Sequence, residues 1–255
     1  MIDVRHADLA GRSVFITGGG SGIGAALTEA FISQGSRVAF VQRSDANAFC
    51  DSVEQRHGVR PLFLPCDITD RSALQAAISA AAEAHGPVGV LINNAANDQR
   101  HRTEELDEAG WNASMAVNLT AYFFAIQAVV GPMRAAGGGS IINFSSISYI
   151  MGNAGYPAYV TANAGITGMT RALAREFGPD RIRVNALAPG WVLTERQRRL
   201  WASPEDLEAH LAKQCLKEHL SQEDICGGAL FLASNASRMM TGQVLVIDGG
   251  VVVTG

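Results

Sequence analysis

Short apolar runs alternate with longer, helix-like segments along almost the whole chain of 255 residues. The apolar runs are rich in Val, Ile, Leu and Phe and are bounded by turn-forming residues, which is typical of strands buried on both faces. Because such strands separated by helices indicate a parallel sheet covered on both sides, the pattern predicts an α/β protein. We expect one doubly wound domain over residues 1–255, with a seven-stranded, mostly parallel sheet.

The predicted strands begin with a run from Val14 and continue with Arg37–Gln42, Arg60–Pro65, Val88–Ile92, Gly139–Phe144, Ile182–Leu187 and Gln243–Ile247. The predicted helices include Ala25–Ser33, Asp45–His57, Asp70–Ala84, Trp111–Ala135 and Pro157–Phe177. Residues 191–220 are less regular and precede the last helix. An insertion there lies over the carboxyl edge of the sheet, so this segment is expected to be a substrate lid, although a solvated helical hairpin fits the pattern equally well.

A glycine-rich turn follows the first apolar run, in the stretch Val14–Ala25, and a helix-forming segment comes directly after it. Glycines let the backbone turn tightly and approach a pyrophosphate, while the free N–H groups at the helix start bind its negative charge. Taken alone, an ordinary tight turn would have the same pattern. Polar residues after the third and fourth strands, Asp67 and Asn93-Asn94, can contact an adenine ring, brace this turn or simply cap a helix.

Composition and charge narrow the function classes. The formal net charge of −4 argues against a nucleic-acid binder, which usually carries a concentrated basic face. The four cysteines contain no Cys-x-x-Cys pair, so neither a metal site nor a disulfide framework is predicted. The N-terminus lacks an apolar signal region, and the most apolar stretch, Ala121–Met133, is too short and interrupted to span a bilayer. A cytoplasmic enzyme is the expectation.

The residues best suited to chemistry are Ser146, Tyr159 and Asn163. Ser146 follows the fifth predicted strand, and Tyr159 and Asn163 are four residues apart on one helix face. A tyrosine hydroxyl can act as a general acid or base when its pKa, near 10 if unperturbed, is lowered. A neighbouring serine hydroxyl can hydrogen-bond the oxygen on which charge develops. In isolation, either residue could equally have a packing or turn role.

Taken together, these motifs resemble the short-chain dehydrogenase/reductase family, which has a Rossmann fold. The resemblance covers nearly the full length, although Ala96 stands where glycine is usual. The matching motifs are Thr17-Gly18-x-x-x-Gly22-x-Gly24, Asn93-Asn94-Ala95, Asn118, Ser146 thirteen residues before Tyr159, Pro189-Gly190 and Asp248-Gly249-Gly250.

The resemblance implies a role for each matched position. The implied catalytic residues are Asn118, Ser146, Tyr159 and Asn163, with Tyr159 as base, Ser146 holding the reacting oxygen and Asn118 supporting a water relay. The implied NAD(P) contacts are Gly18, Ser21, Gly22, Ile23, Gly24, Gln42, Arg43, Asp67, Ile68, Asn94, Ala95, Tyr159, Asn163, Pro189, Gly190 and Val192. The resemblance also implies a homotetramer that pairs through the two long helices.

One position departs from the family pattern Tyr-x-x-x-Lys, because Asn163 stands where the lysine is expected. The family's lysine holds the nicotinamide ribose and lowers the tyrosine pKa by its charge. If losing that charge raises the tyrosine pKa by ~2 units, the tyrosinate fraction near neutral pH falls roughly 100-fold. Three accounts stay open: an altered proton relay with compensation from Arg100, Arg102 or Arg196, a substitution made for study, and a catalytically weak nucleotide-binding relative.

The cofactor choice depends on the end of the second strand, where the family's NAD-preferring members usually carry Asp or Glu. Here the residues are Gln42 and Arg43. A carboxylate would repel the 2′-phosphate of NADP, whereas a guanidinium can pair with it. We therefore expect NADP to be accepted along with NAD and slightly favoured, with Arg43 as the determinant. A solvent-facing arginine is the alternative interpretation.

The substrate expectation rests on loops that resemble a branch of sugar dehydrogenases, including bacterial D-xylose 1-dehydrogenases. A polar rim suits a polyhydroxylated ligand better than an acyl chain, which needs an apolar groove. The expected substrate contacts are Asn97, Asp98, Arg100, His101, Ser148, Asn153, Trp191 and Arg196. The expected reaction is hydride transfer between a sugar carbon and the nicotinamide. A 3-oxoacyl or ketone reductase of the same family is the alternative.

Overall fold

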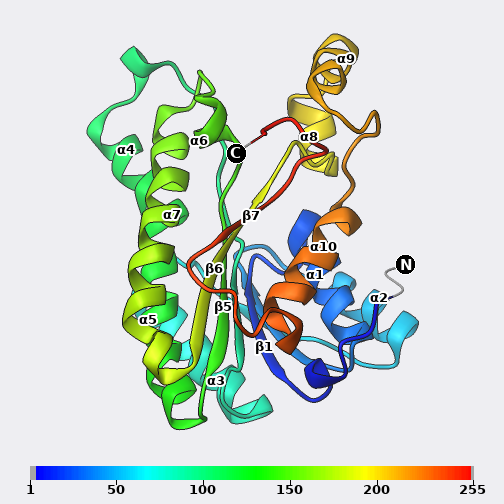
Figure 1. Ribbon diagram of the computed structural model, residues 1–255, viewed down its shortest axis with the longest axis vertical. Helices are drawn as coiled ribbons and strands as arrows, with labels where there is room; N and C mark the ends of the chain where they lie inside the picture. The colour runs from blue at the N-terminus through cyan, green and yellow to red at the C-terminus, as the bar shows by residue number, and fades with distance from the viewer. Residues whose placement is uncertain (1–3, 254–255) are drawn as a thin grey trace.

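Seven parallel strands form one sheet in the computed structural model, which describes residues 4–253 (Figure 1). The strand order is β3-β2-β1-β4-β5-β6-β7, and every neighbouring pair is parallel. The sheet is therefore entirely parallel where the sequence pattern predicted a mostly parallel one. The strands are β1 Ser13–Thr17, β2 Arg37–Gln42, β3 Leu62–Pro65, β4 Val90–Asn93, β5 Gly139–Phe144, β6 Ile182–Pro189 and β7 Val244–Ile247.

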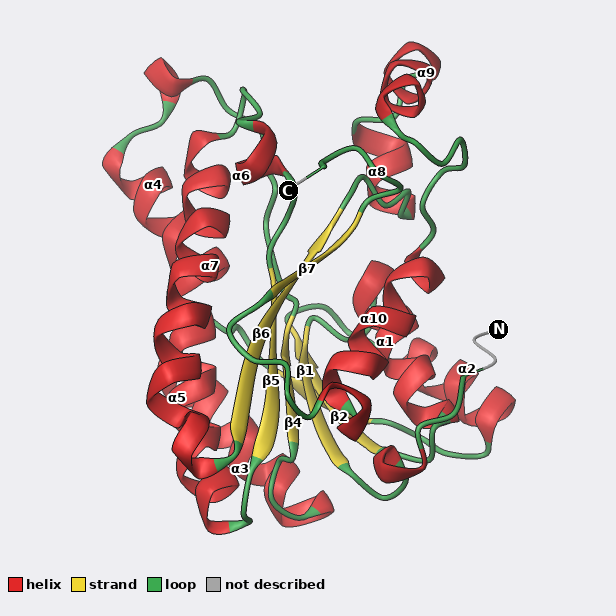
Figure 2. Ribbon diagram, in the orientation of Figure 1, coloured by secondary structure: helices red, strands yellow, loops and turns green. Residues whose placement is uncertain are grey.

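Helices cover both faces of the sheet, as expected for buried parallel strands (Figures 1 and 2). One layer contains α1 Gly22–Ser33, α2 Asn47–His57 and α10 Gln222–Ala233. The other contains α3 Arg71–His85, α4 Glu108–Met115, α5 Ala121–Ala135 and α7 Pro157–Phe177. The short helix α6 Ser148–Met151 precedes α7, and α8 Glu195–Leu200 and α9 Pro204–Lys213 lie beyond the carboxyl ends of the strands.

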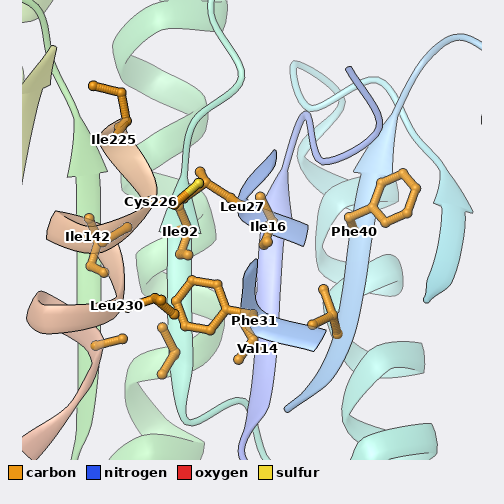
Figure 3. Packing of buried hydrophobic residues seen from close by; sticks show 14 of the residues in the cluster. Val14, Ile16, Leu27, Phe31, Phe40, Ile92, Ile142, Ile225, Cys226 and Leu230 are labelled. Carbon is orange, nitrogen blue, oxygen red and sulfur yellow. The ribbon is translucent and has the colours of Figure 1, made fainter. Parts of the chain in front are cut away.

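Each helical layer encloses its own hydrophobic cluster against the sheet. Figure 3 shows the first cluster, in which Leu27 and Phe31 of α1 and Leu230 of α10 lie over Val14 and Ile92 of the central strands. On the opposite face, side chains of α3, α5 and α7 pack against the alternate residues of the same strands, such as Phe15 and Leu91. The continuous apolar strands thus bury both of their faces, which explains their lack of polar alternation.

The predicted elements have small boundary errors, except for the helix expected at Trp111–Ala135. That helix begins earlier, at Glu108, and contains a π-helical turn, Ala116–Thr120, between α4 and α5. The combined run Glu108–Ala135 is long and apolar enough to cross a membrane by length and composition, unlike the shorter stretch considered from the sequence. Here Tyr122, Ala125 and Ile126 of this run are buried in the cluster that covers the sheet.

Candidate active site

Loops from several strands meet at the carboxyl edge of the sheet (Figure 2). A cavity of about 400 Å³ opens there, at the carboxyl ends of β4, β5 and β6. Ligands of open α/β sheets bind at this edge. Fourteen of the residues predicted from the sequence line the cavity. They are Ile23, Asn94, Asp98, Arg100, Asn118, Ser146, Ser148, Asn153, Tyr159, Asn163, Pro189, Gly190, Trp191 and Val192.

The glycine loop between β1 and α1 forms one side of this edge, and its conformation requires glycine. Gly18 has a φ of +71°, in the left-handed region, and a Cβ at Gly24 would lie 1.8 Å from the carbonyl oxygen of Gly18. The Asn94 side chain donates to the carbonyl oxygens of Thr17 and Gly18, at 3.1 Å each. Asn94 therefore braces the loop from the neighbouring strand, one of the roles considered from the sequence.

The start of α1 leaves backbone donors for an anionic ligand. Its N-cap residue, Ser21, makes no side-chain capping hydrogen bond, and the first turn contains no acidic residue. The unpaired N–H groups and the positive end of the helix dipole suit a pyrophosphate, and the glycines let it approach closely. The residues present therefore fit a dinucleotide cofactor at this position.

The end of β2 presents two polar side chains with different surroundings. The Gln42 side chain turns toward the glycine loop, where its Oε1 accepts from the Gly20 N–H at 3.0 Å. The Arg43 side chain is 80% exposed, and its only ion pair within residues 4–253 is a 3.9 Å contact with Asp67. Asp67 itself accepts from the Thr69 backbone N–H and hydroxyl, which hold the pKa of its carboxyl below the usual value. Arg43 is thus available to a ligand beside the loop.

The structure brings Ser146, Tyr159 and Asn163 to one wall of the cavity. Ser146 follows β5, and its Oγ accepts from the Ser148 N–H at 3.2 Å, which fixes the turn that leads into α6. Tyr159 lies in the first turn of α7, where its ring stacks on that of Tyr156 with centroids 5.4 Å apart. Asn163 is buried one turn later, and its Nδ2 donates to the Tyr159 carbonyl oxygen at 2.8 Å.

Burial, together with the Asp98 carboxylate, raises the pKa of the Tyr159 hydroxyl to about 12. The Ser146 and Asn163 side chains lower it and offset part of this effect. None of the arginines that the sequence offered as compensation acts on Tyr159. Arg196 pairs with Asp98 at 3.1 Å, and Arg102 pairs with Glu104. Electrostatic compensation by these arginines is therefore not supported, because Arg102 and Arg196 are paired with carboxylates and Arg100 lies over the Trp201 ring.

Asn118 lies in the π-helical turn between α4 and α5 and is buried. Its Oδ1 accepts from the Asn97 N–H at 2.8 Å, and its Nδ2 donates to the carbonyl oxygens of Asn97 and Ser114. These bonds fasten the loop that follows β4 to the long helix. Turns of this kind are frequent at functional sites, because they redirect a side chain without ending the helix.

The segment predicted as a lid covers the cavity through α8 and α9. The Asp98 carboxylate accepts from Arg196 at 3.1 Å and from the Gln197 Nε2 at 2.6 Å, and the Gln197 Oε1 accepts from the Trp191 indole at 2.9 Å. Thr194 caps α8 and lies against Gly22 of the glycine loop. The segment therefore bridges the loop after β4 and the glycine loop.

Several predicted residues lie outside the cavity lining. The Asn97 backbone is held by Asn118, and the His101 N–H donates to the Gly155 carbonyl oxygen at 2.8 Å. Arg196 reaches the site only through Asp98, and Ile68 is buried in the core. The remaining ones belong to the glycine loop or flank the ends of β2, β3 and β4: Gly18, Ser21, Gly22, Gly24, Gln42, Arg43, Asp67 and Ala95.

Nine further residues line the cavity from segment 191–220, from α6 and from the loop before α7, and were not predicted from the sequence. These are Met151, Tyr156, Thr194, Gln197, Trp201, Asp206, Ala209, His210 and Lys213. For the seven of them that lie in the irregular segment 191–220, the only signal in the sequence is the high density of Trp, His and charged residues there. No cluster of potential metal ligands occurs among residues 4–253, as far as groups of His, Cys, Asp and Glu are concerned.

Comparisons with a family model, with curated proteins and with solved structures each found a match over nearly the full chain. A family model described as enoyl-(acyl carrier protein) reductase matches residues 18–252. A protein named probable galactose dehydrogenase, from Rhizobium meliloti, is 49% identical over 249 residues, covering 97% of each chain. The D-xylose 1-dehydrogenase of Caulobacter vibrioides is 42% identical over 251 residues, covering 98% of this chain and 99% of its own.

A solved structure has the same fold over almost all of its length. It is described as a putative short-chain alcohol dehydrogenase from Sinorhizobium meliloti, and it matches with a TM-score of 0.90 and 32% identity. The match covers 95% of this chain and 96% of that one.

Proposed function

The chain belongs to the short-chain dehydrogenase/reductase family of oxidoreductases, and on that premise we propose that it is an NAD(P)-dependent sugar dehydrogenase. The observation that carries the proposal is that Ser146 and Tyr159 share one cavity with Ile23 and Asn94 of the cofactor edge. A reacting alcohol held by Ser146 and Tyr159 would then lie next to the nicotinamide end of a dinucleotide. Hydride transfer between the two requires this neighbourhood.

The chain's own residues have distinct tasks in the proposed oxidation. When bound, the nicotinamide supplies the hydride acceptor. Ser146 donates its hydroxyl hydrogen to the substrate oxygen and holds it in place, and the Tyr159 oxygen takes the proton of the substrate hydroxyl. Asn118 hydrogen-bonds the loop after β4 beside these two residues. From its π-helical turn, Asn118 would also support a water relay that carries the proton away from Tyr159.

Asn163 changes how strongly Tyr159 can act as a base. Its amide is neutral and is turned toward the Tyr159 carbonyl, so it brings no positive charge to the hydroxyl. With a pKa of about 12, Tyr159 is almost entirely protonated at neutral pH. The proposed enzyme therefore oxidises its substrate slowly at neutral pH and faster in alkaline solution, while the reverse reduction begins with Tyr159 in its protonated form.

The sugar assignment is supported by the polar character of the cavity and by the relatives' names. Ser148 is 2% exposed, its Oγ has no hydrogen-bond partner among residues 4–253, and it lines the cavity. Asn153 lies nearby, where its Nδ2 donates to the Tyr156 hydroxyl. A ligand with several hydroxyl groups would satisfy such atoms, whereas an acyl chain would leave them unpaired. We infer oxidation at C1 of an aldose, as in the galactose and xylose dehydrogenases.

NADP is the cofactor that we infer to be favoured, with NAD accepted as well. The exposed Arg43 guanidinium is held only by a long contact with Asp67, so it can turn to a 2′-phosphate without losing a strong ion pair. Gln42 is neutral and does not repel that phosphate. A cytoplasmic homotetramer with residues 191–220 as substrate lid completes the proposal.

A screen of NAD and NADP reduction over aldoses, polyols and aldonic acids, repeated across a range of pH, tests the proposed function. We expect turnover on at least one aldose, increasing with pH. Turnover only on 3-oxoacyl or simple ketone substrates would replace the sugar assignment with a ketone reductase. Cofactor binding without turnover on any substrate would identify a nucleotide-binding relative, which the neutral Asn163 makes the second candidate.

A further inference from the structure

The lid half of the cavity holds a group of hydrogen-bond donors that the proposed chemistry does not use. We propose that these donors bind an anionic group, carried by the substrate at the end remote from the oxidised carbon. The donors are Arg100, Trp201, His210 and Lys213. This inference rests on the proposed function and deepens it, because it defines the substrate as an acidic sugar.

Two of the donors are cations without a carboxylate partner among residues 4–253. Arg100 forms no ion pair or side-chain hydrogen bond there, and its guanidinium lies 4.5 Å from the centre of the Trp201 ring and 5.8 Å from that of Tyr156. This stacking fixes the guanidinium plane while leaving its N–H groups free. Lys213, in the last turn of α9, likewise has no ion pair or hydrogen bond from its ammonium group.

The other two donors, Trp201 and His210, each have a buried nitrogen without a hydrogen-bond partner among the described residues. The indole Nε1 of Trp201 and the Nε2 of His210 are shielded from solvent and have no hydrogen bond within the described chain. His210 and Lys213 are three residues apart on α9, so both belong to the helix face that lines the cavity. An unpaired buried polar nitrogen is costly, so a ligand that pairs with it gains affinity.

Both carboxylates of the same cavity already accept hydrogen bonds from the protein. Asp98 accepts from Arg196 and Gln197, and Asp206 accepts from the Ser203 hydroxyl at 2.7 Å at the start of α9. Both oxygens of Asp98 therefore have donors. Apart from the second oxygen of Asp206, the free groups on the lid side are Arg, Lys and Trp donors, which cannot accept a hydrogen bond, together with one imidazole.

A set composed almost entirely of donors, two of them charged, is complementary to a group with several acceptor oxygens and a negative charge. A neutral sugar hydroxyl would leave most of these donors unsatisfied. A carboxylate, phosphate or sulfonate would accept from several of them at once. With C1 at Tyr159, a hexose would direct such a group from C6 toward the lid.

The test compares pairs of substrates that differ only at C6. The kcat/KM for D-galacturonate and for D-galactose is measured with NADP, together with D-glucose 6-phosphate against D-glucose, which separates carboxylate from phosphate recognition. Calorimetric titration of each sugar into the NADP-loaded protein gives binding without relying on turnover. We expect the anionic member of at least one pair to bind and react about tenfold better.

Lys213→Gln and Arg100→Gln should each reduce that preference by about tenfold, and Lys213→Arg should restore it. The matched controls are Arg199→Gln in α8 and Arg102→Gln in the loop of Arg100. Both remove one positive charge outside the cavity and should keep the preference. Turnover of the uncharged sugar by each variant shows that the variant is folded.

The absence of a preference for the anionic sugar in both pairs overturns the inference, and so does an anionic preference that survives both Lys213→Gln and Arg100→Gln. Absence of turnover on every sugar would instead refute the proposed function. In that case the calorimetric titration alone tests the inference. Binding of the anionic sugar that is weakened by Lys213→Gln supports the inference, and the absence of such binding overturns it.

Discussion

The Nδ2 of Asn163 donates to the backbone carbonyl oxygen of Tyr159, 2.8 Å away and one helical turn earlier in α7. The amide is thus turned along its own helix and brings no positive charge to the Tyr159 hydroxyl. The charged group that acts on this hydroxyl is the Asp98 carboxylate, which raises its pKa. The pKa of the Tyr159 hydroxyl is therefore raised by burial and by one anion, and two neutral hydrogen-bonding side chains oppose that increase.

The first prediction concerns Asn163→Lys. A lysine ammonium beside Tyr159 favours the tyrosinate and lowers the tyrosine pKa from about 12. Because a base acts only when deprotonated, kcat/KM for sugar oxidation in the wild-type protein should increase about tenfold per pH unit from pH ~7 to pH ~10, without a plateau. The variant should reach its plateau at a lower pH and be about 100-fold more active near neutrality if the pKa falls by ~2 units.

Asn163→Gln is the control for that substitution, because it lengthens the side chain without adding charge. Its pH profile should remain close to that of the wild type. A wild-type plateau below pH ~8, or a lysine variant with no displacement of the profile toward acid, would contradict the electrostatic explanation.

The second prediction is that Tyr159→Phe lowers kcat for sugar oxidation by about 10²–10⁴, since the change removes the group that takes the proton. Cofactor affinity should change little, and fluorescence titration with NADPH checks it. Tyr149→Phe in α6 is a matched control outside the cavity lining and should keep full activity. Full turnover by the Tyr159 variant would exclude Tyr159 as the base.

The third prediction concerns Arg43→Ala. Removing the guanidinium should raise KM for NADP about tenfold or more, corresponding to one lost charge-assisted contact with the 2′-phosphate, while KM for NAD stays nearly constant. Steady-state kinetics with both cofactors at saturating sugar measure this, and NAD serves as the internal control. Equal effects on the two cofactors would show that Arg43 does not select the phosphate.

The fourth prediction is that Gly24→Ala abolishes cofactor binding. The added methyl group would lie 1.8 Å from the Gly18 carbonyl oxygen, so the glycine loop must move away from its present position. The increase in Tm on adding NADP should disappear. Gly131→Ala, on α5 with nothing within 4 Å of the new methyl group, should keep that increase and be slightly more stable, by up to ~1 kcal/mol. Undiminished NADP binding by the Gly24 variant would contradict the role of the loop.

The predictions of local structure were confirmed where residue types within one short segment determine its conformation. The run from Val14 forms the buried strand β1, and the glycines after it are required by the φ of Gly18 and the contact at Gly24. The predicted strand Arg37–Gln42 has those bounds in the structure. The π-helical turn at Asn118 was missed, because an added residue in a helix leaves the apolar pattern on both sides almost intact.

The electrostatics of the site could not be predicted in the same way. From the sequence, Arg100, Arg102 and Arg196 were all available to Tyr159, since they lie in loops near the site. In the structure Arg196 is paired with Asp98, and Arg100 stacks on Trp201, which is 101 residues away in the chain. Such pairings join segments that are distant in sequence, so no local pattern reports them.

The sequence by itself determined the order of strands and helices, the cofactor loop and the Ser146–Tyr159 pair, because each depends on residue type and spacing within one segment. Only the tertiary structure decided which side chains meet at the cavity: Asp98 bonds to Arg196 and Gln197 of α8, and Arg100 lies over Trp201. Burial and charge pairing determine the pKa of Tyr159 and which donors at the cavity lack a partner. Both depend on contacts between segments that are distant in the sequence.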